Sequence, residues 1–133
     1  MPSETETQAL VAAAKDACSR AYCPYSRFPV GAAVRAADGR VFAGCNVENA
    51  SFGLTVCAER SAIFNAVAAG AREIAALAVY TPTEAPVTPC GACRQVLLEF
   101  GRDADVVCAC AGGQPLSFKA PDLLPHGFTL SAS

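Results

Sequence analysis

The segment CAERSAIFNAVAAGAREIAALAVYTPTEAPVTPCGACRQVLLEFG, residues 57–101, contains the patterns that decide the fold. Residues 57–69 predict a helix that ends before Gly70, because glycine is the usual residue just beyond a helix C-terminus. Ile74–Tyr80 is an apolar run without polar alternation, which indicates a strand buried on both faces.

A second helix is predicted at the end of this segment. Thr88 followed by Pro89 is typical of an N-cap and a first helical position, and Gly101 is expected to end the helix after Phe100. A buried strand that lies between two helices in the sequence must be covered by helices on its faces. The segment therefore predicts an α/β fold.

The flanking regions extend this unit on both sides. Residues 7–21 favour a helix because Ala, Leu and Lys have high helix propensity. Two strand-like runs separated by Ala-Asp-Gly indicate a hairpin. The other expected elements are the strands Val30–Ala36, Arg40–Asn46, Asp105–Ala111 and Pro115–Lys119 and a turn or short helix at 121–125. This order predicts a mixed five-stranded sheet covered by helices, with parallel central strands and antiparallel hairpins.

Length and composition limit the function classes. The 133 residues are expected to form a single domain, 1–133, with a flexible N-terminus at about 1–6. Charged residues make up 17%, against about 25% in typical domains, so we expect an oligomer to cover part of the surface. A net charge of −2 without clustered Lys and Arg argues against nucleic acid as a partner. No signal-peptide pattern or membrane-length apolar run is present, which indicates a cytoplasmic protein without a membrane partner.

The chain has eight cysteines, which in a reducing compartment more often bind metal or react than form disulfides. Cys90-Gly91-Ala92-Cys93 places two thiols on one face of a predicted helix start, where the helix dipole favours thiolates. By itself this motif leaves two alternatives open, a redox dithiol of thioredoxin type and half of a zinc site.

Cys57-Ala58-Glu59 opens the other predicted helix and favours the zinc site. If the two helix N-termini converge at one edge of the sheet, three thiolates surround one metal and leave a fourth position for water, as in catalytic zinc sites. The structural alternative is a closed site completed by His126, the only histidine. Glu59 is then expected beside the open position as a proton carrier.

Three thiolates give a zinc site a net negative formal charge, which weakens its ability to acidify water. We expect the two helix N-termini, Arg60 and Arg94 to supply compensating positive potential. The alternative for Arg94 is an ordinary surface charge.

These motifs resemble the signature of the small zinc-dependent cytidine deaminases, namely Cys57-Ala58-Glu59 with Pro89-Cys90-Gly91-Ala92-Cys93-Arg94-Gln95-Val96. The resemblance covers nearly the whole chain and implies a three-layer α-β-α fold. The further segments that resemble the family, in the same order, are Cys23-Pro24-Tyr25-Ser26, Phe28-Pro29-Val30-Gly31-Ala32-Ala33, Gly44-Cys45-Asn46-Val47-Glu48-Asn49-Ala50, and Leu123-Leu124-Pro125 with Phe128.

The resemblance also implies roles for individual residues. One Zn²⁺ per chain is implied, bound by Cys57, Cys90 and Cys93 with Glu59 as the catalytic residue. The implied substrate contacts are hydrogen bonds from Asn46 and Glu48 to the ribose hydroxyls, packing of Phe28 against the base, and a backbone contact from Ala58 to the pyrimidine. Phe128 is implied to reach the site of a neighbouring subunit in a homotetramer.

The implied reaction is zinc-dependent hydrolytic deamination of cytidine and 2′-deoxycytidine to uridine and 2′-deoxyuridine, with release of ammonia, in pyrimidine salvage. A deaminase of a modified nucleoside such as blasticidin S shares the zinc residues, but Asn46-Val47-Glu48-Asn49 argues against it. A structural zinc-binding module explains the cysteines but leaves Glu59 and Arg60 without a role. The remaining cysteines are expected to be buried, reduced thiols: Cys18, Cys23, Cys45, Cys108 and Cys110.

Overall fold

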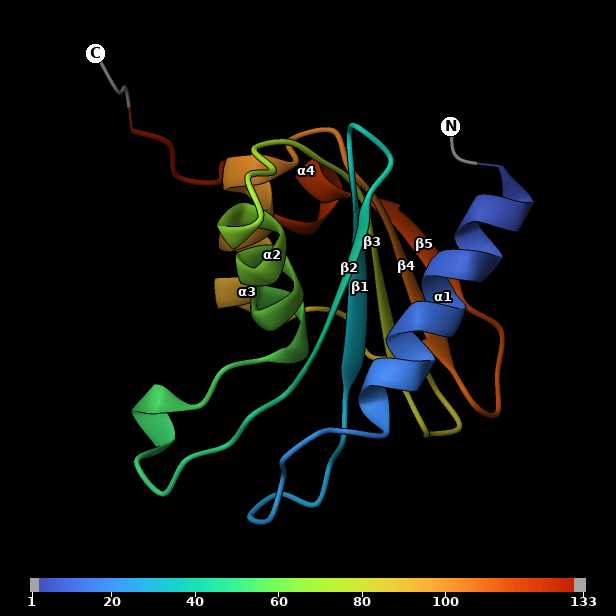
Figure 1. The fold of residues 1–133 in the computed structure, drawn as a ribbon, viewed down its shortest axis with the longest axis vertical. Coiled ribbons are helices and arrows are strands. Elements are labelled where there is room, and N and C mark those ends of the chain that lie inside the picture. Colours follow the sequence, from blue (N-terminus) through green and yellow to red (C-terminus); the bar gives the residue numbers. More distant parts are fainter. Residues whose placement is uncertain (1–2, 131–133) are drawn as a thin grey trace.

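The computed structural model describes residues 3–130 and contains one mixed sheet with helices on both faces (Figure 1). The strands are β1 Gly31–Ala36, β2 Val41–Cys45, β3 Ile74–Thr81, β4 Asp105–Cys110 and β5 Leu116–Lys119. The helices are α1 Glu4–Cys18, α2 Ala58–Ala68, α3 Gly91–Phe100 and α4 Ala120–Leu123, with a 3-10 turn, η1, at Phe52–Leu54. The predicted α/β fold and element order are confirmed, and η1 is an addition.

The sheet has the strand order β2-β1-β3-β4-β5. Strands β3 and β4 pair in parallel, because α3 carries the chain back between them. The three other pairings are antiparallel, including the two hairpins β1–β2 and β4–β5. The predicted mixture of parallel central strands and antiparallel hairpins is therefore confirmed.

Helix α1 covers one face of the sheet, and α2, α3 and α4 cover the other (Figure 1). On the second face, Ile63 of α2, Leu77 of β3 and Leu97 of α3 are fully buried in one apolar cluster. Leu10 and Ala14 of α1 form a smaller cluster on the first face. All residues of β3 except Ala75 are buried, as the absence of polar alternation predicts.

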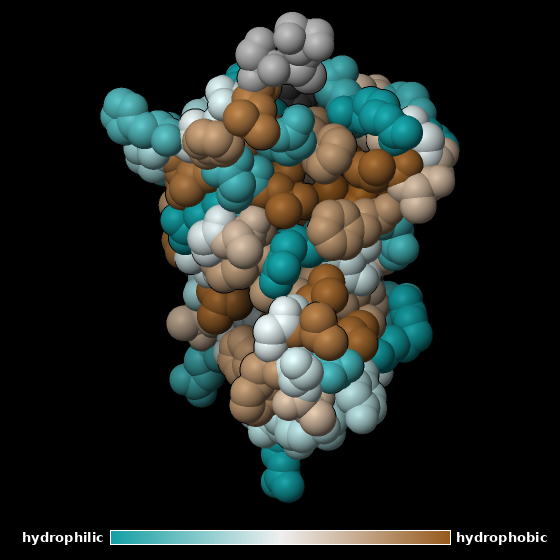
Figure 2. Space-filling model, turned by 90° about the vertical axis from the view of Figure 1, so that its left-hand side faces the viewer, coloured by the Kyte–Doolittle hydropathy of each residue, from teal (hydrophilic) through white to brown (hydrophobic). Residues whose placement is uncertain are grey.

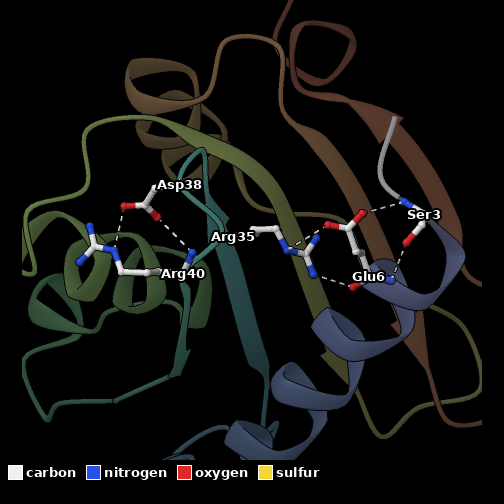
Figure 3. A network of polar contacts seen from close by, with 5 residues as sticks. All are labelled: Ser3, Glu6, Arg35, Asp38 and Arg40. Carbon is white, nitrogen blue, oxygen red and sulfur yellow. Dashed lines mark hydrogen bonds and ion pairs between the residues drawn. The ribbon is translucent and has the colours of Figure 1, made fainter.

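Helix α1 begins at Glu4, three residues earlier than predicted, because Ser3 and Glu6 form a capping box. The Glu6 N–H donates to Ser3 Oγ and the Ser3 N–H donates to Glu6 Oε1, both at 3.1 Å (Figure 3). Arg35 of β1 also donates to the Glu6 carbonyl oxygen at 2.7 Å. Residues 3–6 of the segment expected to be flexible thus form the capped start of α1, and residues 1–2 lie outside the described part.

The turn between β1 and β2 is held by Asp38, as the Ala-Asp-Gly signal predicts. Its carboxylate accepts from the Arg40 backbone N–H at 3.0 Å and from Arg40 Nε at 2.9 Å (Figure 3). Gly39 has a φ of 95°, a left-handed conformation that glycine adopts without steric cost. These contacts fix the register of the hairpin that leads into the site.

The predicted start of α3 is wrong by two residues. The N-cap is Cys90 and the first helical residue is Gly91, so Thr88 and Pro89 precede the helix. The Thr88 hydroxyl accepts a hydrogen bond from Arg94 Nη2 at 2.9 Å, which takes the place of a capping bond to the backbone. The predicted end holds, since Gly101 follows Phe100.

Among residues 3–130, none of the helices has the length and apolar character that a membrane span requires.

Helix α2 lies so close to β2 that Gly44 has no space for a side chain. A Cβ atom at Gly44 would lie 2.5 Å from the backbone nitrogen of Ala62 and 2.8 Å from the carbonyl carbon of Ser61. Real Cβ atoms do not approach a backbone so closely, so strand or helix must shift when a side chain is added. Since α2 carries Glu59, the close approach at Gly44 also fixes how far Glu59 lies from the sheet.

We therefore expect Gly44→Ala to lower the free energy of unfolding by about 2 kcal/mol, because it overpacks a rigid backbone contact. Gly53→Ala is the matched control, since a Cβ atom at Gly53 would meet nothing within 4 Å. Chemical denaturation of both variants measures the difference. Equal stability of the two variants would contradict the close approach.

Candidate metal centre and active site

The sulfur atoms of Cys57, Cys90 and Cys93 form one cluster. Cys57 Sγ lies 3.8 Å from Cys90 Sγ, Cys90 Sγ lies 3.4 Å from Cys93 Sγ, and all three lie within 4.8 Å of one another. A tetrahedral zinc ion with Zn–S distances of about 2.3 Å needs sulfur atoms about 3.8 Å apart. The cluster therefore fits zinc with little rearrangement.

Two helix N-termini bring these thiols together. Cys57 is the N-cap of α2, Cys90 is the N-cap of α3, and Cys93 lies in the first turn of α3. Unpaired backbone N–H groups and the helix dipole favour negative charge at both positions. Among the described residues this is the one cluster able to hold a metal, and His126 is not part of it. The cluster leaves a fourth tetrahedral position free of a histidine ligand.

The three thiols are arranged to lose protons to a metal. Interaction with the Cys93 thiol, supported by the Arg60 guanidinium, lowers the pKa of Cys57 to about 5. The pKa of Cys93 is raised, because its thiol bonds to Cys57 and is buried. The lowered pKa of Cys57 favours a thiolate there, and a bound divalent ion displaces the protons that the other thiols carry.

The two arginines have different surroundings. Arg60 Nη2 donates to Cys57 Sγ at 3.4 Å, so its charge lies directly beside the cluster. Arg94 donates instead to the Pro89 and Leu123 carbonyl oxygens at 2.6 Å and 2.8 Å, in addition to its bond to Thr88. Arg94 thus joins the start of α3 to the end of α4. It is partly buried and not an ordinary surface charge, and none of its described hydrogen bonds goes to a sulfur atom of the cluster.

Glu59 is the buried acid of the site. It lies in the first turn of α2 and is only 5% exposed. Burial raises the pKa of its carboxyl to about 7, with a further contribution from the negative charge on Cys57. A carboxyl with this pKa can accept and release protons near neutral pH.

A cleft of about 360 Å³ opens onto these groups, which is a size suited to a small molecule. It brings together most of the residues that sequence analysis selected, from four separate segments. The cleft is lined by Ser26, Phe28, Val30, Asn46, Glu48, Thr55, Cys57, Ala58, Glu59, Val87, Thr88 and Cys90.

Asn46 and Glu48 line one side of this cleft and also hold the segment that carries Phe28. Asn46 Nδ2 donates to the Phe28 carbonyl oxygen and Asn46 Oδ1 accepts from the Val30 N–H, each at 2.9 Å. The Glu48 carboxylate accepts from the backbone N–H groups of Tyr25 and Ser26, each at 3.0 Å. Both polar side chains are therefore fixed in place before any ligand binds.

Phe128 is not part of the cleft. It is 66% exposed, and its backbone exchanges two hydrogen bonds with the side chain of Gln95 on α3.

Sequence analysis missed Ser26, Thr55 and Thr88 as cleft residues. A serine or threonine in a loop is usually a turn residue, and only the position of Ser26 in a segment with family resemblance distinguishes it.

The other five cysteines stand apart from this cluster as free thiols. Cys18 and Cys108 are buried, as expected, and burial raises the pKa of Cys108 to about 11. Cys23, Cys45 and Cys110 are only partly buried, which corrects the expectation that all five lie in the core. No described cysteine forms a disulfide.

Residues 4–110 match the model of the cytidine and deoxycytidylate deaminase zinc-binding region. A cytidine deaminase of Halalkalibacterium halodurans is 47% identical over 125 residues, covering 93% of this chain and 95% of the relative. One of Sporosarcina psychrophila is 55% identical over 95 residues, covering 71% of this chain and 70% of the relative.

A crystal structure of cytidine deaminase from Burkholderia pseudomallei superposes with a TM-score of 0.87 at 53% identity, covering 91% of this chain and 98% of that one. The structure of the Mycobacterium tuberculosis enzyme gives a TM-score of 0.81 at 41% identity, covering 93% and 98%. The family model spans the cysteine cluster and every helix and strand except β5 and α4, and the chain belongs to the zinc-dependent cytidine and deoxycytidylate deaminase family.

Proposed function

We propose that this chain catalyses the hydrolytic deamination of cytidine and 2′-deoxycytidine to the corresponding uridines, with release of ammonia. The observation that carries the proposal is a buried Glu59 carboxyl beside three converging thiols at a cleft of nucleoside size. The relatives with matching folds are cytidine deaminases, which supports the same substrate class. A role in pyrimidine salvage is part of the proposal.

The cleft offers separate contacts for the base and the sugar. Phe28 is half-buried in its wall and presents an aromatic ring against which a pyrimidine can pack. The Ala58 backbone lies between Cys57 and Glu59 at the start of α2, where it can bond to the polar edge of the base. Asn46 and Glu48 retain hydrogen-bonding capacity for ribose hydroxyls on the opposite side.

Cys57, Cys90 and Cys93 would hold the zinc ion, which would supply the Lewis acidity that makes water nucleophilic near neutral pH. Glu59 accepts one proton from the attacking water and delivers it to the ring nitrogen N3. It then accepts the proton of the hydroxyl group newly bonded to C4 and delivers it to the amine, which leaves as ammonia while the C4 carbonyl forms. Its pKa near 7 suits both directions of transfer.

Arg60 offsets the excess negative charge of three thiolates. Its guanidinium donates to Cys57 Sγ, and charge-assisted hydrogen bonds of this type withdraw electron density from the sulfur atom. The two helix N-termini act in the same direction. Together they support the acidification of water that a thiolate-rich zinc site would otherwise weaken.

We propose a homotetramer with sites at subunit interfaces, and the exposed apolar surface supports association between subunits. Figure 2 shows the side of the molecule that carries α2 and α3, where apolar side chains gather in several clusters. Large apolar residues are exposed on α2, on η1 and in the C-terminal segment, namely Phe64, Phe52, Leu54, Phe128 and Leu130. A neighbouring subunit that covers this side would let Phe128 reach a site other than its own.

We expect Glu59→Gln to keep zinc and to lower the turnover of cytidine by more than about 10⁴-fold, because the amide cannot shuttle protons. Ammonia release measures turnover, and metal analysis measures zinc. Glu99→Gln is the control, since Glu99 is an exposed residue of α3 outside the cleft. Turnover near the wild-type value in Glu59→Gln would refute the assignment of the proton carrier.

Replacement of a ligand should act on metal binding before it acts on catalysis. We expect Cys93→Ala to weaken zinc affinity by more than about 100-fold, measured by competition with a chromophoric chelator. Cys108→Ala is the matched control, because Cys108 is equally buried but outside the cluster. Loss of zinc from Cys108→Ala, or its retention in Cys93→Ala, is inconsistent with the proposed ligand set.

Subunit mixing tests the proposed position of Phe128. Glu59→Gln and Phe128→Ala chains should each be impaired alone and should regain activity when unfolded and refolded together. A mixed oligomer contains sites in which Glu59 of one chain is completed by Phe128 of its neighbour. Activity that does not exceed the average of the separate variants would mean that Phe128 does not act across an interface.

A further inference from the structure

The Ser26 hydroxyl joins two segments that border the cleft, the loop that carries Phe28 and the segment that carries Glu48. Ser26 Oγ donates to Glu48 Oε2 and accepts a hydrogen bond from the Phe28 N–H at 3.0 Å. Glu48 is 22 residues further along the chain, so the bond to it is tertiary and not part of the local turn. Ser26 itself also lines the cleft.

The loop occupies most of the hydrogen-bonding capacity of Glu48. An ionised carboxylate offers about four acceptor positions. Two are taken at Oε1 by the Tyr25 and Ser26 N–H groups, and a third is taken at Oε2 by the Ser26 hydroxyl. About one position therefore remains for a ligand, and the hydroxyl of Ser26 is the one described partner that fixes Oε2.

These three donors also keep the carboxylate ionised. The Ser26 hydroxyl, followed by the backbone N–H groups, holds the pKa of Glu48 below its usual value. An ionised carboxylate can only accept hydrogen bonds, so its free position selects a donor such as a sugar hydroxyl. The direction in which that position faces depends on how the carboxylate plane is held.

The backbone around Ser26 is itself firmly placed. Arg27 has a φ of 56°, an uncommon left-handed conformation for a residue other than glycine, and its N–H donates to the Cys23 carbonyl oxygen at 2.9 Å. The Phe28 carbonyl oxygen accepts from Asn46 Nδ2. With the turn held at both ends, removal of the Ser26 hydroxyl should release Oε2 of Glu48 without unfolding the loop.

We propose that Ser26 is a positioning residue whose hydroxyl orients Glu48 Oε2 so that its free acceptor position meets a hydroxyl of the substrate sugar. Ser26 thereby acts on recognition of the sugar, through Glu48, and makes no contact with the reacting atoms. The inference rests on the proposed function.

The test compares cytidine with 2′,3′-dideoxycytidine, which lacks only the 2′ and 3′ hydroxyls of the sugar. We expect Ser26→Ala to raise KM for cytidine about tenfold, the effect of a lost hydrogen bond to a charged group, with kcat changed less than twofold. KM for 2′,3′-dideoxycytidine should change less than twofold, because neither the 2′ nor the 3′ hydroxyl is present to meet Glu48. Ser26→Thr keeps the hydroxyl and should restore KM for cytidine.

Ser51→Ala serves as the matched control, because Ser51 is the N-cap residue of η1 and its side chain makes no capping hydrogen bond. An equal rise in KM for both substrates, an unchanged KM for cytidine, or a Ser26→Thr variant that behaves like Ser26→Ala would overturn the proposal. Absence of ammonia release from cytidine by the zinc-loaded wild-type protein would instead refute the proposed function, so the two failures are distinguishable.

Discussion

A metal site made of three thiols requires that their sulfur atoms meet at one point. The arrangement of α2, β3 and α3 satisfies this requirement. The chain runs along α2, returns through the buried strand β3 and reverses again into α3. Two reversals make the helices run in the same direction, so that both N-termini lie at the same end of the sheet. Cys57 and Cys90 occupy the two N-cap positions, and their sulfur atoms are 3.8 Å apart.

This convergence determines the electrostatics of the site. Two sets of unpaired N–H groups and the Arg60 guanidinium provide positive potential, while three thiols concentrate negative charge at the same place. Glu59 follows Cys57 by two residues, so the helix that supplies a ligand also carries the buried carboxyl toward the metal position. In the proposed mechanism, metal binding and proton transfer therefore depend on the same turn of α2.

Sequence alone predicts the parts of the site that local spacing determines. The i, i+3 pair Cys90 and Cys93, and Glu59 two residues after Cys57, follow from the helix geometry of short motifs. The start of α3 was not predictable in this way, because Arg94 engages Thr88 and leaves Cys90 as the N-cap. The bond from Ser26 to Glu48 and the position of Arg94 depend on contacts between distant segments, which no local pattern encodes.

The coordination of zinc is the most direct test of this account, and X-ray absorption at the zinc edge of the purified protein measures it. We expect three sulfur atoms at about 2.3 Å and one oxygen atom at about 2.0 Å, since Cys57, Cys90 and Cys93 leave one position for water. Four sulfur atoms, or three with an imidazole nitrogen, would contradict it, because a closed site has no position at which water can be activated.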